Sequence, residues 1–145
     1  MPSKKQDALA GQLRPLLARL VRKLRKVSPA NESLSQSARS VLVLLDQHQQ
    51  LLSAELAVME KMTPQSMGQL LLQLAAQGLI TRTPSNSDKR KIYLSLSPAG
   101  KERIARVRRE RDEWLSNAIA TVCTKEEQAI LQAALAPLAR LVEFE

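Results

Sequence analysis

The feature that most constrains the fold is a capped amphipathic helix that runs into a basic hairpin, between residues 62 and 100. Thr63 is a favourable N-cap, and Pro64 suits the first helical position. Met62 and Met67 are spaced to pack together across the helix entry. Apolar residues then recur at i, i+3, i+4 and i+7, which predicts one buried face made of Met67, Leu70, Leu71 and Leu74. Gly78 ends this helix.

Two segments of alternating polarity follow, and they predict a hairpin of strands at about residues 79–83 and 91–96, joined by a polar loop. Upstream, Ser35 is placed to cap a helix of about 36–47. A short helix of about 53–59 and a turn at 60–62 then lead into the capped helix. Two helices joined by a short turn and followed by a hairpin predict a winged helix-turn-helix, whose helix and hairpin tip fit neighbouring grooves of DNA.

Long amphipathic helices are expected on both sides of this central unit. The first covers about residues 7–26, Ser97 and Pro98 begin the next, and Thr124 and Glu127 form a capping box for the last. Their apolar stripes are too long for the central unit to cover, which favours an intertwined homodimer over a monomeric helical bundle with the same pattern. We expect a mainly α (α+β) fold with an N-terminal dimerisation helix and loop (1–32), a winged helix-turn-helix (33–98) and C-terminal dimerisation helices (99–145).

The charge of the chain favours a polyanionic partner, since the net charge is +8 and the pI is near 10.2. Residues 1–26 carry eight basic side chains and one acidic one, and the hairpin is the second basic region. The aromatic residues are only Tyr93, Trp114 and Phe144, which disfavours single-strand binding by base stacking.

Several classes of function are disfavoured. One cysteine, Cys123, and one histidine, His48, lack companions at ligand spacing, so we expect no metal site and no cofactor. We interpret Cys123 as a structural or incidental thiol and His48 as a loop residue. No pairing of a nucleophile with a base suggests an enzyme. No apolar run is long enough to span a bilayer, and an amphipathic helix follows the basic start, so we expect a cytoplasmic protein with no membrane partner.

Three short motifs follow one another through the central unit: G-L-I-x-R at 78–82, D-K-R at 88–90 and L-x-L-S-x-x-G at 94–100. With Glu55-Leu56-Ala57 and the PQSMG run at 64–68, they resemble the MarR (multiple antibiotic resistance regulator) family of bacterial transcription factors. The resemblance covers nearly the whole chain. It implies an obligate homodimer of triangular outline, bound to a pseudo-palindromic operator and often released by small aromatic or phenolic ligands. Family members that sense oxidants do so with a cysteine near the N-terminus, which this chain lacks.

The recognition helix displays a polar face opposite its buried stripe. Gln65 and Gln69 lie on that face, and glutamine can contact adenine through two hydrogen bonds in the major groove. Gly68 would let the backbone approach DNA, and the amides of the helix N-terminus suit a phosphate. No Lys or Arg lies between Lys61 and Arg82, so base readout by this helix must be uncharged. The candidate contacts are Thr63, Pro64, Gln65, Ser66, Gly68, Gln69 and Gln73; the alternative is a plain solvated face.

The hairpin tip is the second candidate contact. By resemblance, Arg90 matches the family arginine that enters the minor groove, whose negative potential attracts a guanidinium. The wing candidates are Arg82, Lys89, Arg90 and Lys91, the alternative being an ordinary charged loop tip. We expect Asp88 to position the hairpin by pairing with Arg82 or Arg90.

Leu72 is apolar although it shares a side with the polar face. We expect another element, such as the dimerisation helices, to cover it. Because the family's effector pocket lies near that junction, Leu72 is a candidate pocket wall, with simple core packing as the alternative. Arg14 and Arg22 are candidates to pair with a ligand carboxylate, although phosphate steering or solvation explains them equally well.

Together these features predict a homodimeric regulator of transcription that binds double-stranded DNA, a repressor released by a small aromatic or amphipathic ligand. The alternative is a winged-helix protein-interaction module without specific DNA readout. The cations at the hairpin tip favour DNA, because an interaction module has no need of them. Double-stranded RNA is disfavoured, since its deep, narrow major groove does not admit a helix.

Overall fold

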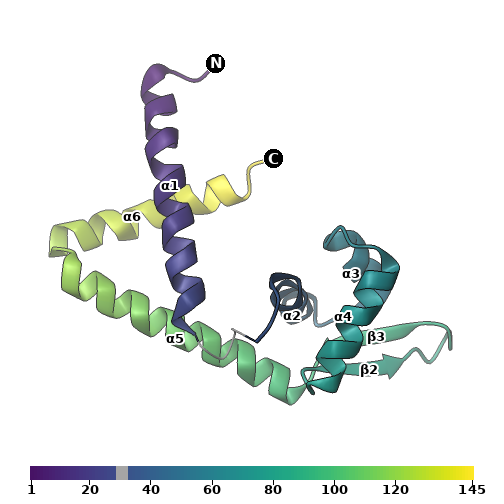
Figure 1. The fold of residues 1–145 in the computed structure, drawn as a ribbon. Helices are drawn as coiled ribbons and strands as arrows, with labels where there is room; N and C mark the ends of the chain where they lie inside the picture. The colour runs from purple at the N-terminus through teal and green to yellow at the C-terminus, as the bar shows by residue number, and fades with distance from the viewer. Residues whose placement is uncertain (29–32) are drawn as a thin grey trace.

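The computed structural model describes residues 1–28 and 33–145. Residues 34–96 form a small winged unit, and the long helices before and after it form a frame (Figure 1). The predicted loop at 28–33 lies largely outside the described residues. The elements are α1 (Lys4–Val27), α2 (Gln36–His48), β1 (Gln50–Leu52), α3 (Ser53–Met59), α4 (Pro64–Ala76), β2 (Ile80–Pro84), β3 (Ile92–Leu96), α5 (Pro98–Val122) and α6 (Lys125–Val142). This mainly helical architecture with a small antiparallel sheet confirms the predicted fold class.

Side-chain caps set the starts of the helices. The predicted caps Ser35, Thr63, Ser97 and Thr124 each accept a hydrogen bond from the amide three residues further on. Helix α1 begins three residues earlier than predicted. Ser3 caps it, and a capping box with Gln6 satisfies a second amide there.

The sheet has three antiparallel strands in the order β1-β3-β2, with Leu51 and Arg82 flanking Leu94 on either side. Strand β1 was not predicted, because three residues are too few to show an alternating pattern. The hairpin strands begin one residue later than predicted. Gly78, with φ of 71°, and Leu79 donate hydrogen bonds back to the carbonyls of Ala75 and Leu74, so Leu79 closes α4 before the strand starts.

The core of the winged unit is made by α2, α3, α4 and the sheet. All four predicted apolar residues of α4 are buried, with Met67 completely enclosed. Gly100 explains how α5 joins this unit. A Cβ at Gly100 would lie 2.1 Å from the carbonyl oxygen of Leu79, so only glycine permits the close approach of the two backbones. Ser97 fixes the same junction, since its amide donates to Leu79 O at 3.1 Å.

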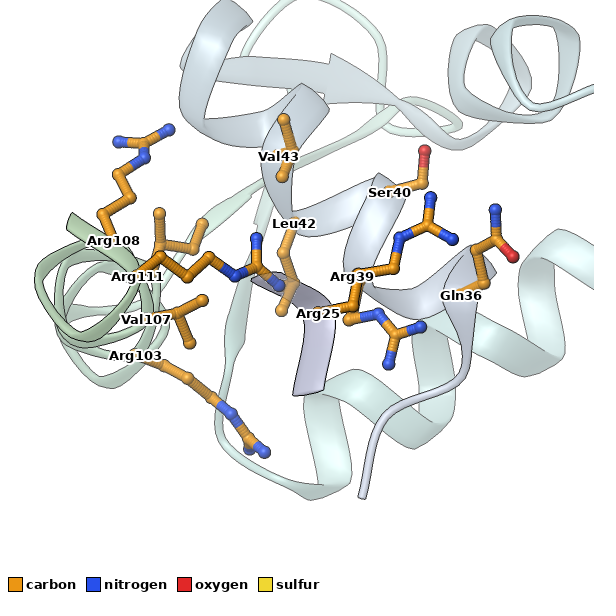
Figure 2. Close-up of a pocket in the computed structure, with 11 residues that line it drawn as sticks. Arg25, Gln36, Arg39, Ser40, Leu42, Val43, Arg103, Val107, Arg108 and Arg111 are labelled. Carbon is orange, nitrogen blue, oxygen red and sulfur yellow. The ribbon is translucent and has the colours of Figure 1, made fainter. Parts of the chain in front are cut away.

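The long helices extend away from this core (Figure 1). Helix α1 packs against α5, and a pocket remains where both meet α2 (Figure 2). No residue of α1 or α6 is buried in the described chain. Large apolar side chains lie exposed on both helices, among them Leu9, Leu16, Leu17, Leu20, Val21, Ile130, Leu131, Leu135 and Val142. No helix in residues 1–28 or 33–145 combines the length and apolar character needed to cross a membrane.

Candidate nucleic-acid interface

Helix α4 presents an uncharged polar face beside the winged hairpin. Gln65, Gln69 and Gln73 are exposed along it. At its N-terminus, Thr63 Oγ1 accepts a hydrogen bond from the Ser66 amide at 3.1 Å and donates to Ser66 Oγ at 2.9 Å. The Thr63 side chain therefore occupies one of the N-terminal amides of α4 that we expected to be free for a phosphate. The exposed glutamine amides carry the hydrogen-bonding capacity of this face.

Leu72 does not lie where we expected it. Its side chain is 58% exposed and lines a depression of about 210 Å³ with Gly68, Arg82 and Ile92, between α4 and the sheet. Within the chain, α4 packs against α3 and β2 rather than against the long helices. The expectation that these helices cover Leu72 is therefore wrong for the single chain. The sequence pattern showed an apolar residue on the polar side but not which neighbour it faced.

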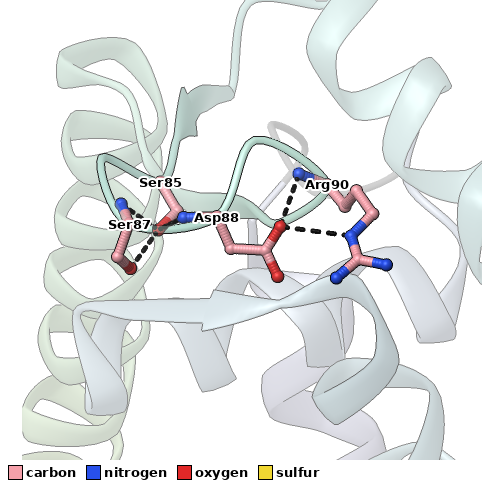
Figure 3. Close-up of polar contacts among 4 residues, drawn as sticks. All are labelled: Ser85, Ser87, Asp88 and Arg90. Atoms are coloured by element: carbon pink, nitrogen blue, oxygen red, sulfur yellow. Dashed lines mark hydrogen bonds and ion pairs between the residues drawn. The ribbon is translucent and has the colours of Figure 1, made fainter.

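The hairpin tip is shaped by short polar contacts (Figure 3). Ser85 Oγ accepts from the amides of Ser87 and Asp88, both at 3.3 Å. Asp88 Oδ1 in turn accepts from the Arg90 amide at 3.0 Å and from Arg90 Nε at 3.3 Å. Of the two partners left open by the sequence, the structure forms the pair with Arg90.

This pairing leaves the guanidinium end of Arg90 available. The Arg90 side chain is 92% exposed although Asp88 restrains its Nε. Lys89 and Lys91 are exposed on either side. Arg82 lies exposed on β2, opposite Leu94 of β3. The tip therefore projects three cations from the winged unit, whereas α4 carries none.

A pocket that the sequence analysis missed lies among α1, α2 and α5, with a volume of about 300 Å³. Five arginines line it: Arg25, Arg39, Arg103, Arg108 and Arg111. Leu42, Ile104 and Val107 supply the apolar wall, and Figure 2 labels Leu42 and Val107 among the arginines. The α5 members Arg103, Val107 and Arg111 recur at i, i+4 and i+8, which is a signal of one helical face that the sequence does contain.

The predicted effector residues are not brought together. Leu72 lies in the depression beside the sheet, and neither Arg14 nor Arg22 of α1 lines the α1–α2–α5 pocket. Arg25, one turn beyond Arg22, lines it instead. A helical pattern gives the face of each residue, whereas the crossing point of α1 on α5 decides which turn reaches the pocket.

The two other residues singled out by the sequence lie apart from these surfaces. His48 is the exposed last residue of α2 rather than a loop residue. Cys123 is a half-buried free thiol at the end of α5, where its amide donates to Ile119 O at 3.1 Å.

The core, the polar face of α4 and the basic hairpin define a winged helix-turn-helix protein with long helical extensions. The sequence profile of the MarR family matches residues 34–92. Over 135 residues the chain is 33% identical to an HTH-type transcriptional regulator of Mycobacterium tuberculosis, and the match covers 93% of each chain. The chain therefore belongs to the MarR family of transcriptional regulators, as the resemblance indicated.

Solved structures agree with this assignment. A protein of Pseudomonas aeruginosa described as a transcriptional regulator is 31% identical, with a TM-score of 0.81, over 99% of this chain and 100% of that one. A mutant of S. aureus MepR shares the fold at 20% identity, with a TM-score of 0.71, over 92% of this chain and 96% of that one.

Proposed function

We propose that the protein is a homodimeric, sequence-specific DNA-binding repressor, released from its operator by a small amphipathic ligand. The observation that carries the proposal is the pairing of two surfaces on one winged unit. An exposed row of glutamines on α4 lies beside a hairpin whose tip carries Lys89, Arg90 and Lys91. The first suits base edges in the major groove, and the second suits the minor groove and phosphates.

The structural neighbours support DNA as the partner. The S. aureus MepR mutant was solved bound to an oligodeoxyribonucleotide. In our proposal α4 enters the major groove in the same general manner as other recognition helices. Gln65 and Gln69 read bases, Thr63 and Ser66 approach the backbone, and Gly68 allows the helix to lie close. Arg90 enters the minor groove, with Lys89 and Lys91 at the flanking phosphates.

The bare helices support a homodimer. Helices α1 and α6 bury none of their residues within the described chain. They expose several leucines and valines and one isoleucine, Ile130. Contiguous apolar surface of this kind marks an interaction site. A second copy covers it in our proposal, and a two-fold axis then presents two copies of α4 to half-sites about 34 Å apart.

The pocket supports control by a ligand. It lies between α2 of the winged unit and the long helices α1 and α5, so an occupant touches both parts of the molecule. A change of a few ångströms in the spacing of the two recognition helices prevents simultaneous contact with both half-sites. Release therefore needs no unfolding. By linkage, such a ligand binds the free protein more tightly than the DNA-bound protein by the factor that it weakens DNA binding.

The test is selection of bound sequences from a random duplex pool, followed by titration of the enriched duplex. We expect a pseudo-palindromic motif that binds at least about 1,000-fold tighter than random duplex. Enrichment of no motif, or equal affinity for motif and random duplex, overturns sequence-specific binding and favours a protein-interaction module.

A further inference from the structure

We propose that the ion pair between Asp46 of α2 and Arg108 of α5 is a positioning contact. It holds the winged unit at a fixed angle to α5, and in the dimer it sets the spacing between half-sites that the two recognition helices accept. The effect on spacing rests on the proposed function, whereas the effect on the angle concerns the protein without DNA.

The ion pair joins two parts of the molecule that are distant along the chain. Arg108 Nη2 lies 2.8 Å from Asp46 Oδ2, and the two residues are 62 positions apart. Asp46 follows directly after Leu45, which is 1% exposed in the core of the winged unit. By contrast, Arg109 pairs with Glu102 on α5 itself. A movement of α5 at Arg108 is therefore passed to the core of the winged unit.

The winged unit already meets α5 at a first point, near the start of that helix. There the Ser97 amide donates to Leu79 O, and Gly100 lies too close to the same carbonyl group for a Cβ to fit. Arg108 lies eight residues beyond Gly100, which is about 12 Å along the helix axis. One point of attachment allows the winged unit to pivot, whereas a second point at this distance fixes the angle.

The charges on α2 show why the second point needs a carboxylate. Helix α2 carries one arginine, Arg39, and one acidic residue, Asp46, which lies seven positions later and so on the same side of the helix. Burial lowers the pKa of the Arg111 guanidinium on α5, and repulsion from Arg39 and Arg25 lowers it further. Helix α5 thus repels α2 near Arg39 and attracts it at Asp46. Removal of the attraction shifts this balance towards separation of the two helices.

The ion pair is suited to fixing geometry rather than to stabilising the fold. The side chains of Arg108 and Asp46 are 56% and 32% exposed, so water and salt screen the attraction and the pair adds little to the free energy of unfolding. A small tilt of each winged unit, however, moves the two recognition helices of a dimer relative to half-sites about 34 Å apart. We therefore expect the pair to affect the accepted spacing more than the stability of the protein.

Operators of altered spacing test this effect. One base pair, about 3.4 Å, is added or removed between the half-sites of the selected operator. For each altered duplex, the spacing ratio is its dissociation constant divided by that of the selected operator. Because both constants come from the same protein, changes in overall charge or stability cancel, and a merely structural role does not move the ratio. Wild-type ratios of about one overturn the proposal, because no spacing is then preferred.

Reversal of either charge turns the attraction into repulsion. In Asp46→Arg and in Arg108→Asp, at least one spacing ratio should fall about threefold or more, because the winged unit tilts to a new angle or pivots freely. The double variant restores an opposite-charge pair and should return both ratios to within about twofold of wild type. Wild-type ratios in both single variants overturn the proposal, as does a double variant that is no closer to wild type than the single ones.

A matched reversal on the same helix controls for the change in charge. Arg109→Asp alters the net charge of α5 by the same amount as Arg108→Asp, but its partner Glu102 lies on α5 itself. Its spacing ratios should equal those of wild type. If they fall as far as those of Arg108→Asp, the effect comes from charge rather than from the ion pair, and the positioning role is wrong.

A measurement without DNA separates this inference from the proposed function. A spin label is attached in Val58→Cys, where the side chain is 78% exposed, and Cys123→Ser removes the native thiol. Pulsed electron paramagnetic resonance then gives the distance between the two winged units of a dimer. We expect Asp46→Arg and Arg108→Asp to shift or broaden this distance, and the double variant to restore it.

The two measurements together distinguish the outcomes. If the distance responds but selection enriches no duplex, the positioning contact stands and sequence-specific binding fails. If the operator binds but neither the distance nor the spacing ratios respond, the proposed function stands and the positioning contact is overturned.

Discussion

At the scale of single residues, the hairpin tip combines a positioning residue, Asp88, with an exposed cation, Arg90. Asp88 takes a backbone hydrogen bond and a side-chain ion pair from Arg90, yet the Arg90 side chain remains 92% exposed. A restrained but exposed guanidinium loses less conformational entropy on binding than a free one. The sequence predicted that Asp88 positions the tip, but the choice between Arg82 and Arg90 depended on the turn that the Ser85 hydroxyl stabilises.

Replacement of the exposed arginine tests the wing. Arg90→Ala should weaken operator binding by about 1–3 kcal/mol per half-site and flatten the salt dependence, because fewer counterions are released. The measurement is fluorescence anisotropy with operator duplex at several salt concentrations. Arg109→Ala, which removes a cation from α5, serves as the control. Wild-type affinity and salt slope in Arg90→Ala would show that the tip does not contact DNA.

The glutamines of α4 should affect recognition of the base sequence without affecting the electrostatic attraction to DNA. Gln65→Ala and Gln69→Ala should reduce operator affinity by about 1–3 kcal/mol while leaving binding to random duplex nearly unchanged, since neither side chain is charged. Lys89→Ala should lower both affinities. Parallel titrations on the two duplexes check this, and equal losses on both in the glutamine variants would contradict base readout.

At the scale of the elements, the sequence predicted most of the fold because the caps and apolar periods are local. Ser35, Thr63, Ser97 and Thr124 mark helix starts by chemistry that acts within one turn. Strand β1 escaped prediction because its three residues become a strand only by pairing with β3. The pocket among α1, α2 and α5 escaped prediction for a related reason, since its residues come from three helices whose packing no local pattern determines.

Glycine substitutions test how the elements are joined. Gly100→Ala should destabilise the protein by about 1–3 kcal/mol or more, because its Cβ would meet the Leu79 carbonyl and force α5 away from the winged unit. Gly68→Ala is the matched control: nothing lies within 4 Å of its Cβ, and alanine favours a helix by about 0.5–1 kcal/mol. Urea unfolding of both variants measures the difference. A Gly100→Ala protein as stable as wild type would show that the two backbones separate freely.

At the scale of the whole molecule, burial is unevenly distributed. The winged unit encloses its own core between residues 34 and 96, whereas α1 and α6 expose leucines along their length. Figure 1 shows α6 and most of α1 extending away from the winged unit as an open frame. Such a frame gains stability when a second copy covers it, so we expect folding and dimerisation to be coupled through the long helices.

A charge placed on the frame distinguishes the dimer from a monomer with the same helices. Leu135 on α6 and Val58 on α3 are 57% and 78% exposed in the single chain. Leu135→Asp and Val58→Asp should therefore cost similarly little in a monomer. In the proposed dimer, Leu135→Asp loses the burial of two leucines, about 3–6 kcal/mol by symmetry, and also buries two carboxylates. Analytical ultracentrifugation at micromolar concentration should then find a dimer for wild type and Val58→Asp but monomer for Leu135→Asp, with operator affinity lost in parallel. A wild-type monomer at this concentration, or an intact Leu135→Asp dimer, would contradict assembly through α6.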